Sequence, residues 1–85
     1  MTKTIYVGNL PFNTSEEEIR DLFGQHGNVL SVKLIVDRVT GKSRGFGFVD
    51  MDQNDAESAI GALNGHEVQG RNLKVNEARE RKEGH

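Results

Sequence analysis

The octapeptide Arg44-Gly45-Phe46-Gly47-Phe48-Val49-Asp50-Met51 predicts a strand, because aromatic and aliphatic residues suit a pleated surface. Alternation along a strand puts Arg44, Phe46, Phe48 and Asp50 on one face and Gly45, Gly47, Val49 and Met51 on the other. Burying the first face would gain about 1.5–3 kcal/mol for each Phe ring but would cost several kcal/mol or more for each unpaired charge. Arg44 and Asp50 cannot pair, since roughly 20 Å of strand separates them. Both Phe rings are therefore expected to face solvent, with Val49 and Met51 facing the core.

Three further strands are predicted from the same alternation. Thr4–Gly8 has Ile5 and Val7 on the core side, which turns Tyr6 outward. Residues 29–36 are expected to place Val32, Leu34 and Val36 on one side and Ser31, Lys33 and Ile35 on the other, before a polar loop at 37–43. The last strand, 71–77, has Leu73 and Val75 alternating with Lys74 and Asn76.

Two amphipathic helices separate these strands. The first follows Thr14-Ser15-Glu16-Glu17, which fits a capping box between the Thr14 hydroxyl and Glu17, and its apolar stripe is Ile19, Leu22 and Phe23. The second is capped within 52–55, has the stripe Ala56, Ala59, Ile60 and Leu63, and ends at Asn64-Gly65. The order strand, helix, strand, strand, helix, strand predicts an α+β, ferredoxin-like βαββαβ fold. Its four-stranded antiparallel sheet carries both helices on one face and leaves the other uncovered.

Composition restricts the class of protein. The chain has 85 residues, of which 34% are hydrophobic and 28% charged, so we expect one small domain at 1–78 and a charged, flexible tail at 79–85. No apolar run approaches the roughly 18 residues of a membrane span, and no secretory signal is visible, so a cytoplasmic monomer away from membranes is expected. The chain has no cysteine, which excludes disulfides, thiol chemistry and cysteine zinc sites; neither metal nor cofactor is expected.

Charge is unevenly distributed along the chain. The net charge of −2 by itself argues against a nucleic-acid partner. However, residues 15–26 hold four acids and one base, 28–49 hold four bases and one acid, and 71–85 hold five bases and three acids. Because local charge decides which partners a surface attracts, one acidic and one basic side are predicted.

Three aromatic side chains are expected to gather on the open sheet face, since the first and third strands are central neighbours in this topology. They are Tyr6, Phe46 and Phe48. Contiguous exposed aromatics usually mark a binding site. The basic residues expected around them are Arg44, Lys33, Lys74, Lys42 and Arg38. Flat rings beside cations suit single-stranded nucleic acid, whose bases stack and whose phosphates pair with positive charge.

The octapeptide resembles the ribonucleoprotein octamer of the RNA-recognition motif (RRM) family at every position but the last, where Met51 replaces an aromatic residue. Ile5-Tyr6-Val7-Gly8-Asn9-Leu10 is similar to the companion hexamer. The resemblance covers about residues 3–78 and is greatest to small single-RRM bacterial proteins and to the RRM of plant glycine-rich RNA-binding proteins.

The resemblance implies non-catalytic binding of single-stranded RNA, with single-stranded DNA as a second candidate. It implies base stacking on Tyr6 and Phe48, contact of Phe46 with sugars or between nucleotides, a phosphate on Arg44 and base-edge hydrogen bonds at Asn76. RNA chaperone or post-transcriptional regulator is the implied role.

Two other classes stay open. Acylphosphatases share the layout, but the segment Gly8-Asn9-Leu10-Pro11 is too short for their phosphate loop and lacks an Arg. A protein-interaction module would use the rings against a partner or a terminal segment, and its binding would survive high salt, whereas RNA binding weakens steeply.

Overall fold

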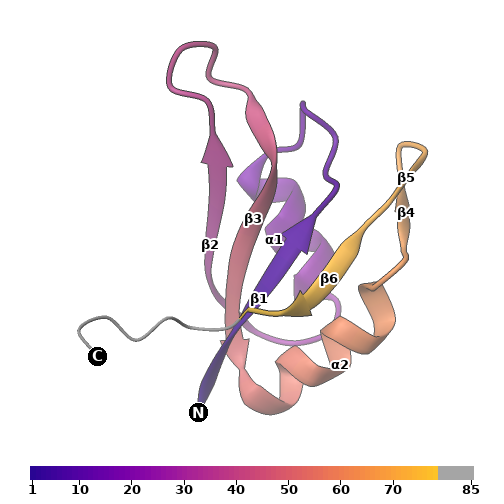
Figure 1. Cartoon of the computed structure of the whole chain (residues 1–85). Helices are drawn as coiled ribbons and strands as arrows, with labels where there is room; N and C mark the ends of the chain where they lie inside the picture. The colour runs from indigo at the N-terminus through magenta and orange to yellow at the C-terminus, as the bar shows by residue number, and fades with distance from the viewer. Residues whose placement is uncertain (79–85) are drawn as a thin grey trace.

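The computed structural model describes residues 1–78, and the expected tail at 79–85 lies outside the described residues. The elements run in the order β1 (Thr2–Gly8), α1 (Glu16–Gly24), β2 (Val29–Val36), β3 (Ser43–Asp52), α2 (Gln53–Leu63), β4 (Glu67–Val68), β5 (Arg71–Asn72) and β6 (Lys74–Glu77) (Figure 1). In this part of the chain, no helix has the length and apolar character needed to cross a membrane.

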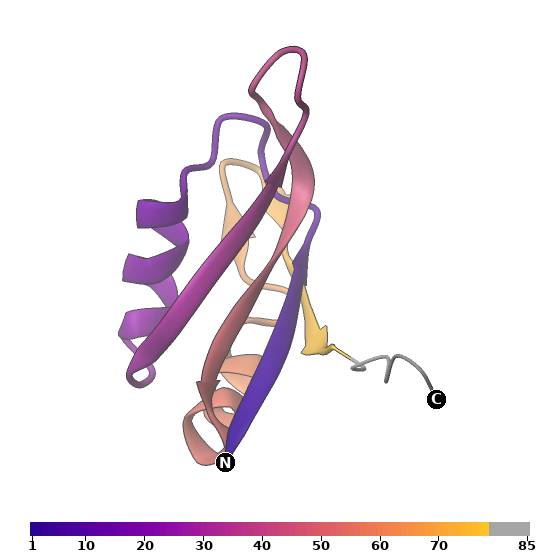
Figure 2. The ribbon, with the colours of Figure 1, turned by 90° about the vertical axis from the view of Figure 1, so that its left-hand side faces the viewer.

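Four of the strands form one antiparallel sheet in the order β2-β3-β1-β6. The central neighbours are β1 and β3, as predicted. Figure 2 shows both helices on one face of this sheet, and within residues 1–78 no helix covers the other face. The ferredoxin-like α+β prediction is therefore confirmed, and its open face is available for a ligand.

The core lies between the sheet and the two helices. Ile5 and Val7 of β1 are completely buried, as are Val49 and Met51 of β3. The remaining buried hydrophobic residues are Leu10, Ile19, Phe23, Ala56, Ala59, Leu63, Leu73 and Val75. The orientation predicted from alternation in β3 is confirmed, because its aliphatic residues are in the core and its Phe rings are not.

The capping box of α1 lies one residue later than predicted. The Ser15 hydroxyl accepts a hydrogen bond from the Glu18 backbone N–H at 3.1 Å, and the Glu18 carboxylate accepts one from the Ser15 N–H at 2.9 Å. Thr14 cannot take this role, because its own backbone N–H donates to the Pro11 carbonyl in the preceding turn. Because Glu16, Glu17 and Glu18 are consecutive, a capping box that begins at Thr14 and one that begins at Ser15 have the same sequence signature. The turn at Pro11 favours the one that begins at Ser15.

The side-chain alternation predicted for β2 holds only in its middle. Val32 and Leu34 pack against the core and Lys33 is exposed. Val36, which alternation places on the same side as Val32 and Leu34, is 45% exposed. Pairing with β3 shifts register between Val29 and Ser31 and again between Leu34 and Val36, so Val36 lies at an irregular end of the strand, next to the β2–β3 loop.

The predicted last strand is divided. Residues 71–72 pair with 67–68 in a separate hairpin, and only 74–77 join the main sheet. The hairpin turn holds Gln69 and Gly70 at φ of 51° and 81°, the left-handed pair that a two-residue type I′ turn requires. Leu73 exchanges backbone hydrogen bonds with the segment after α2, donating to the His66 carbonyl and accepting from the Gly65 N–H. This pairing interrupts the strand.

Candidate nucleic-acid interface

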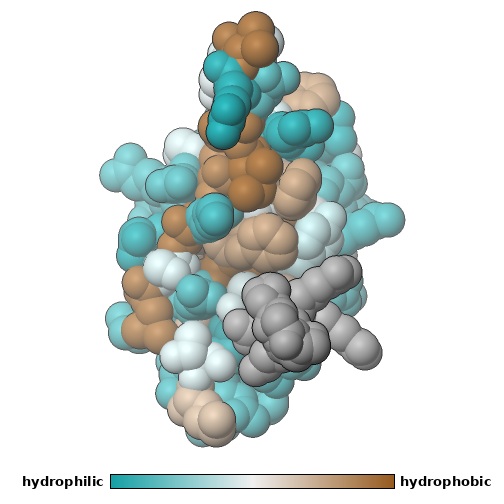
Figure 3. Space-filling view, turned by 60° about the vertical axis from the view of Figure 1, so that its left-hand side comes forward, coloured by the Kyte–Doolittle hydropathy of each residue, from teal (hydrophilic) through white to brown (hydrophobic). Residues whose placement is uncertain are grey.

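Tyr6, Phe46 and Phe48, here called the aromatic cluster, lie together on the open face. Their ring centroids are 6.2 Å apart for Tyr6–Phe46, 6.0 Å for Tyr6–Phe48 and 6.1 Å for Phe46–Phe48. These separations fall in the range of favourable aromatic pairs, about 4.5–7 Å. All three side chains are partly exposed. Figure 3 shows hydrophobic side chains in a band down this side of the molecule, bordered by hydrophilic ones.

One row of the sheet places a cation, two rings and an amide in line. Lys33 on β2 is opposite Phe48 on β3, which is opposite Tyr6 on β1, which is opposite Asn76 on β6. Directly opposite residues in antiparallel strands point to the same face. Lys33 and Asn76 are exposed, so the structure brings both predicted residues to the two ends of the row.

The neighbouring row of opposite residues contains the glycine over which the Tyr6 ring lies. It runs from Phe46 through Gly8 to Lys74, which is exposed. The Tyr6 ring leans along its own strand over Gly8, where a Cβ would collide with the ring. Because Gly8 has no side chain, the Tyr6 ring has room to lie along the strand above it.

A third row carries hydrogen bonds instead of rings. The Asp50 carboxylate on β3 accepts one from the Thr4 hydroxyl on β1 at 2.6 Å and one from the Ser31 hydroxyl on β2 at 2.8 Å. Asp50 lies on the same face as the rings, as alternation predicted. Its carboxylate is engaged by neighbours on both sides, which removes the need for Arg44 as a partner.

The remaining predicted cations lie at the end of the sheet where the β2–β3 loop projects (Figure 1). Arg38, Lys42 and Arg44 are all exposed there. Gly45, with a φ of 96°, interrupts regular strand geometry between Arg44 and Phe46. Lys42 and Arg44 line a hollow of about 340 Å³, which Arg38 does not.

Phe12 is the aromatic residue that the sequence analysis did not select. It follows Pro11 in the β1–α1 loop, lines the same hollow as Arg44, and is 61% exposed. The Arg71 guanidinium lies 5.4 Å from its ring centroid. A large aromatic residue directly after Pro11, outside the expected strands and helices, was the signal that could have identified Phe12.

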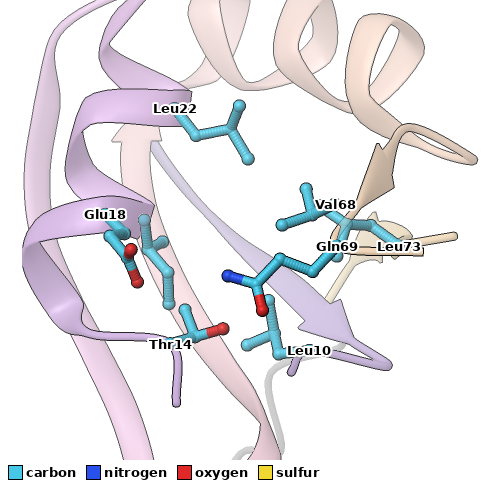
Figure 4. Close-up of a pocket in the computed structure, with 8 residues that line it drawn as sticks. Leu10, Thr14, Glu18, Leu22, Val68, Gln69 and Leu73 are labelled. Atoms are coloured by element: carbon cyan, nitrogen blue, oxygen red, sulfur yellow. The ribbon is translucent and has the colours of Figure 1, made fainter. Parts of the chain in front are cut away.

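A second hollow lies on the helix side of the molecule. Figure 4 shows Leu22 of α1 facing Val68 of β4 across it, with Leu10 at one end. Its volume of about 130 Å³ is small beside the roughly 300–1,000 Å³ of typical ligand sites. Among residues 1–78, no group of three or more His, Cys, Asp or Glu side chains is placed to hold a metal ion.

Comparison with known proteins gives the family. Residues 5–74 match the family model of the RNA recognition motif. The putative RNA-binding protein RbpE of Nostoc sp. is 49% identical over 81 residues, 94% of this chain and 82% of RbpE. The chloroplastic RNA-binding protein CP31B of Arabidopsis thaliana is 49% identical over 78 residues, 91% of this chain but only 27% of CP31B. The crystal structure of RNA binding protein PG1 matches with a TM-score of 0.87 at 54% identity, over 95% of this chain and 99% of PG1. Sequence, strand order and the aromatic cluster agree: the chain belongs to the RNA recognition motif family of RNA-binding domains.

Proposed function

We propose that this chain binds single-stranded RNA across the open face of its sheet, without a catalytic step. The observation that carries the proposal is the aromatic cluster, three partly exposed rings 6.0–6.2 Å apart on a face that no helix covers within residues 1–78. Bases stack on such rings whatever their sequence, because every base has a π-face. The names of the relatives, which describe RNA-binding proteins, support the same ligand.

Each side chain has a proposed part in binding. Tyr6 and Phe48 stack on bases, and Phe46 contacts a sugar or lies between two nucleotides. Asn76, at the end of the row that holds Tyr6 and Phe48, hydrogen-bonds a base edge, since its amide offers both donors and an acceptor. The proposed phosphate-binding cations are Arg44, Lys33, Lys42, Arg38 and Lys74.

The expected affinity is modest. Two or three stacked bases contribute about 1–3 kcal/mol each, from which the cost of association is subtracted, so dissociation constants in the micromolar range are expected. The proposed unit is a monomer whose binding domain is residues 1–78. Its proposed setting is the cytoplasm, and its proposed role is that of an RNA chaperone or post-transcriptional regulator. Both roles suit a domain that binds short single strands with little selectivity.

Removing two rings tests the proposal directly. Phe46→Ala combined with Phe48→Ala is expected to leave the fold intact and to remove most binding to RNA hexamers, as measured by anisotropy of labelled RNA. Val49→Ala is the matched control in the same strand. Because Val49 is fully buried, its truncation lowers stability while leaving the open face unchanged. Unfolding of the double variant, or its unchanged affinity, would contradict the proposal.

Two measurements separate the alternative classes. Binding that does not weaken with rising salt would favour a protein-interaction surface, since phosphate contacts release counterions. Release of phosphate from an acyl phosphate would show catalysis, and none is expected.

A further inference from the structure

The hollow at the loop end of the sheet combines an aromatic ring with positive charge. Phe12 of the β1–α1 loop lines the hollow together with Lys42 of the β2–β3 loop and Arg44 of β3. Arg71 of β5 stacks against the Phe12 ring from the hairpin. Figure 1 shows the β1–α1 loop, the β2–β3 loop and the β4–β5 hairpin at the same end of the molecule. Ring and cations are the combination found on the sheet face itself.

The Phe12–Arg71 pair is held in place before any ligand binds. The Asn9 amide oxygen accepts a hydrogen bond from the Arg71 guanidinium at 3.0 Å, and its amide nitrogen donates to the Asn72 carbonyl at 2.9 Å. Asn9 itself adopts a left-handed φ of 59° between β1 and the loop. A guanidinium fixed near an exposed ring leaves little side-chain entropy to lose on stacking.

The loop that carries Lys42 is also ordered by its own hydrogen bonds. The Lys42 carbonyl accepts from the Asp37 backbone N–H at 2.8 Å, and the Asp37 carboxylate accepts from the Val39 N–H at 2.7 Å. Asp37 is the acidic residue that lines the hollow, and part of its acceptor capacity is used within the loop. Lys42 and Arg44 thus outnumber the acid among the residues that line the hollow.

Phe12 lies beside β3, at the loop end of the sheet beyond the aromatic cluster. The Leu10 N–H donates to the Gly45 carbonyl at 2.9 Å, and the Ser43 N–H donates to the Phe12 carbonyl at 3.3 Å, so the loop runs beside β3. Ser43 is three residues from Phe46. At about 3.3 Å per residue, that places the Phe12 backbone roughly 10 Å along β3 from the row of Phe46.

We infer that Phe12 and Arg71 form an additional stacking platform, which takes one further nucleotide of the bound RNA while Lys42 and Arg44 contact its phosphate. This inference rests on the proposed function. The volume of about 340 Å³ is sufficient for a nucleotide-sized group, since small-ligand sites begin at roughly 300 Å³. The consequence is a binding site longer than the aromatic cluster alone.

Oligonucleotide length provides the test. Oligouridylate and oligoadenylate trimers can occupy the aromatic cluster without reaching Phe12, whereas hexamers can occupy both. Phe12→Ala is expected to weaken hexamer binding by about fivefold or more and to leave trimer binding unchanged. Val39→Ala is the matched control, because Val39 is 92% exposed in the neighbouring loop and does not line the hollow. An equal loss for both lengths, or no loss, overturns the inference.

A fluorescent replacement gives a second readout. The chain has no Trp, so Phe12→Trp creates a single indole that reports directly on stacking at this position. Hexamers are expected to quench it and trimers are not. Equal quenching by the two lengths, or none by the hexamer, contradicts the additional platform. Failure of the wild-type chain to bind any hexamer would instead reject the proposed function itself.

Discussion

The Tyr6 ring lies over Gly8, so that a side chain at residue 8 would collide with the hydroxyl end of the ring. The two residues are on one strand and one face, and Gly8 is also opposite Phe46 on β3. The space left by one glycine therefore sets the orientation of a proposed stacking residue. The colliding atoms are at the free end of the Tyr6 side chain, so the ring can move away with little effect on the backbone.

Gly8→Ala is therefore expected to displace the Tyr6 ring while preserving the fold. Loss of one stacked base costs about 1–3 kcal/mol, which corresponds to at least about fivefold weaker binding of an RNA hexamer. Labelled-RNA anisotropy measures the effect. A double-mutant cycle supplies the control, since Gly8→Ala should add almost nothing in a Tyr6→Ala background. Full additivity of the two changes would show that Gly8 does not act through Tyr6.

Gly47→Ala is expected to act on stability. A Cβ at Gly47 would meet the Lys33 backbone oxygen at 2.7 Å and the Leu34 Cα at 3.2 Å, and backbone cannot move aside as a ring can. Overpacking of this kind costs about 1–3 kcal/mol, measured as a lower urea midpoint. Gly61→Ala is the opposite control, because it lies in α2 with nothing within 4 Å of a new Cβ. It should raise stability by up to about 1 kcal/mol.

Alanine substitutions at the start of α1 distinguish a helix capped by Ser15 from one capped by Thr14. Ser15→Ala removes the hydroxyl that accepts from the Glu18 N–H, and should lower the free energy of unfolding by about 0.5–2 kcal/mol. Thr14→Ala is the matched control, since the Thr14 backbone N–H that closes the turn with Pro11 is retained. Urea unfolding of both variants decides the frame. A larger loss for Thr14→Ala would mean that the helix begins earlier in solution.

Alternation and charge predict the orientation of the residues in the proposed site from the sequence alone. The octapeptide contained two charges that could not both be buried, and this alone turned Phe46 and Phe48 outward. Topology then brought Tyr6 beside them. These inferences succeeded because they depend on period-two geometry and on large energies, which local detail does not reverse.

Features that depend on particular contacts, rotamers or turns could not be predicted in the same way. Val36 lies where the pairing of β2 with β3 becomes irregular, and a single-strand pattern does not show where regular pairing ends. The contact of Tyr6 with Gly8 depends on a side-chain rotamer, and the Phe12–Arg71 pair joins residues 59 positions apart. The sequence fits a cap at Thr14 and a cap at Ser15 equally well, and the hydrogen bond from the Thr14 N–H to the Pro11 carbonyl distinguishes the two.

The salt dependence of RNA binding tests whether Lys33, at the β2 end of the row that holds Phe48 and Tyr6, contacts a phosphate. Lys33 is exposed beside Phe48, and a phosphate contact there should contribute about 0.7 to the slope of log affinity against log salt for a single strand. Lys33→Ala should reduce the slope by that amount and weaken binding to oligouridylate and oligoadenylate alike, because a phosphate contact reads no base. Arg20→Ala removes the same charge from α1, on the covered side of the sheet, and should leave the slope unchanged. If both variants shift the slope equally, Lys33 acts only through net charge; if only Lys33→Ala does so, the phosphate backbone passes over the β2 end of the row.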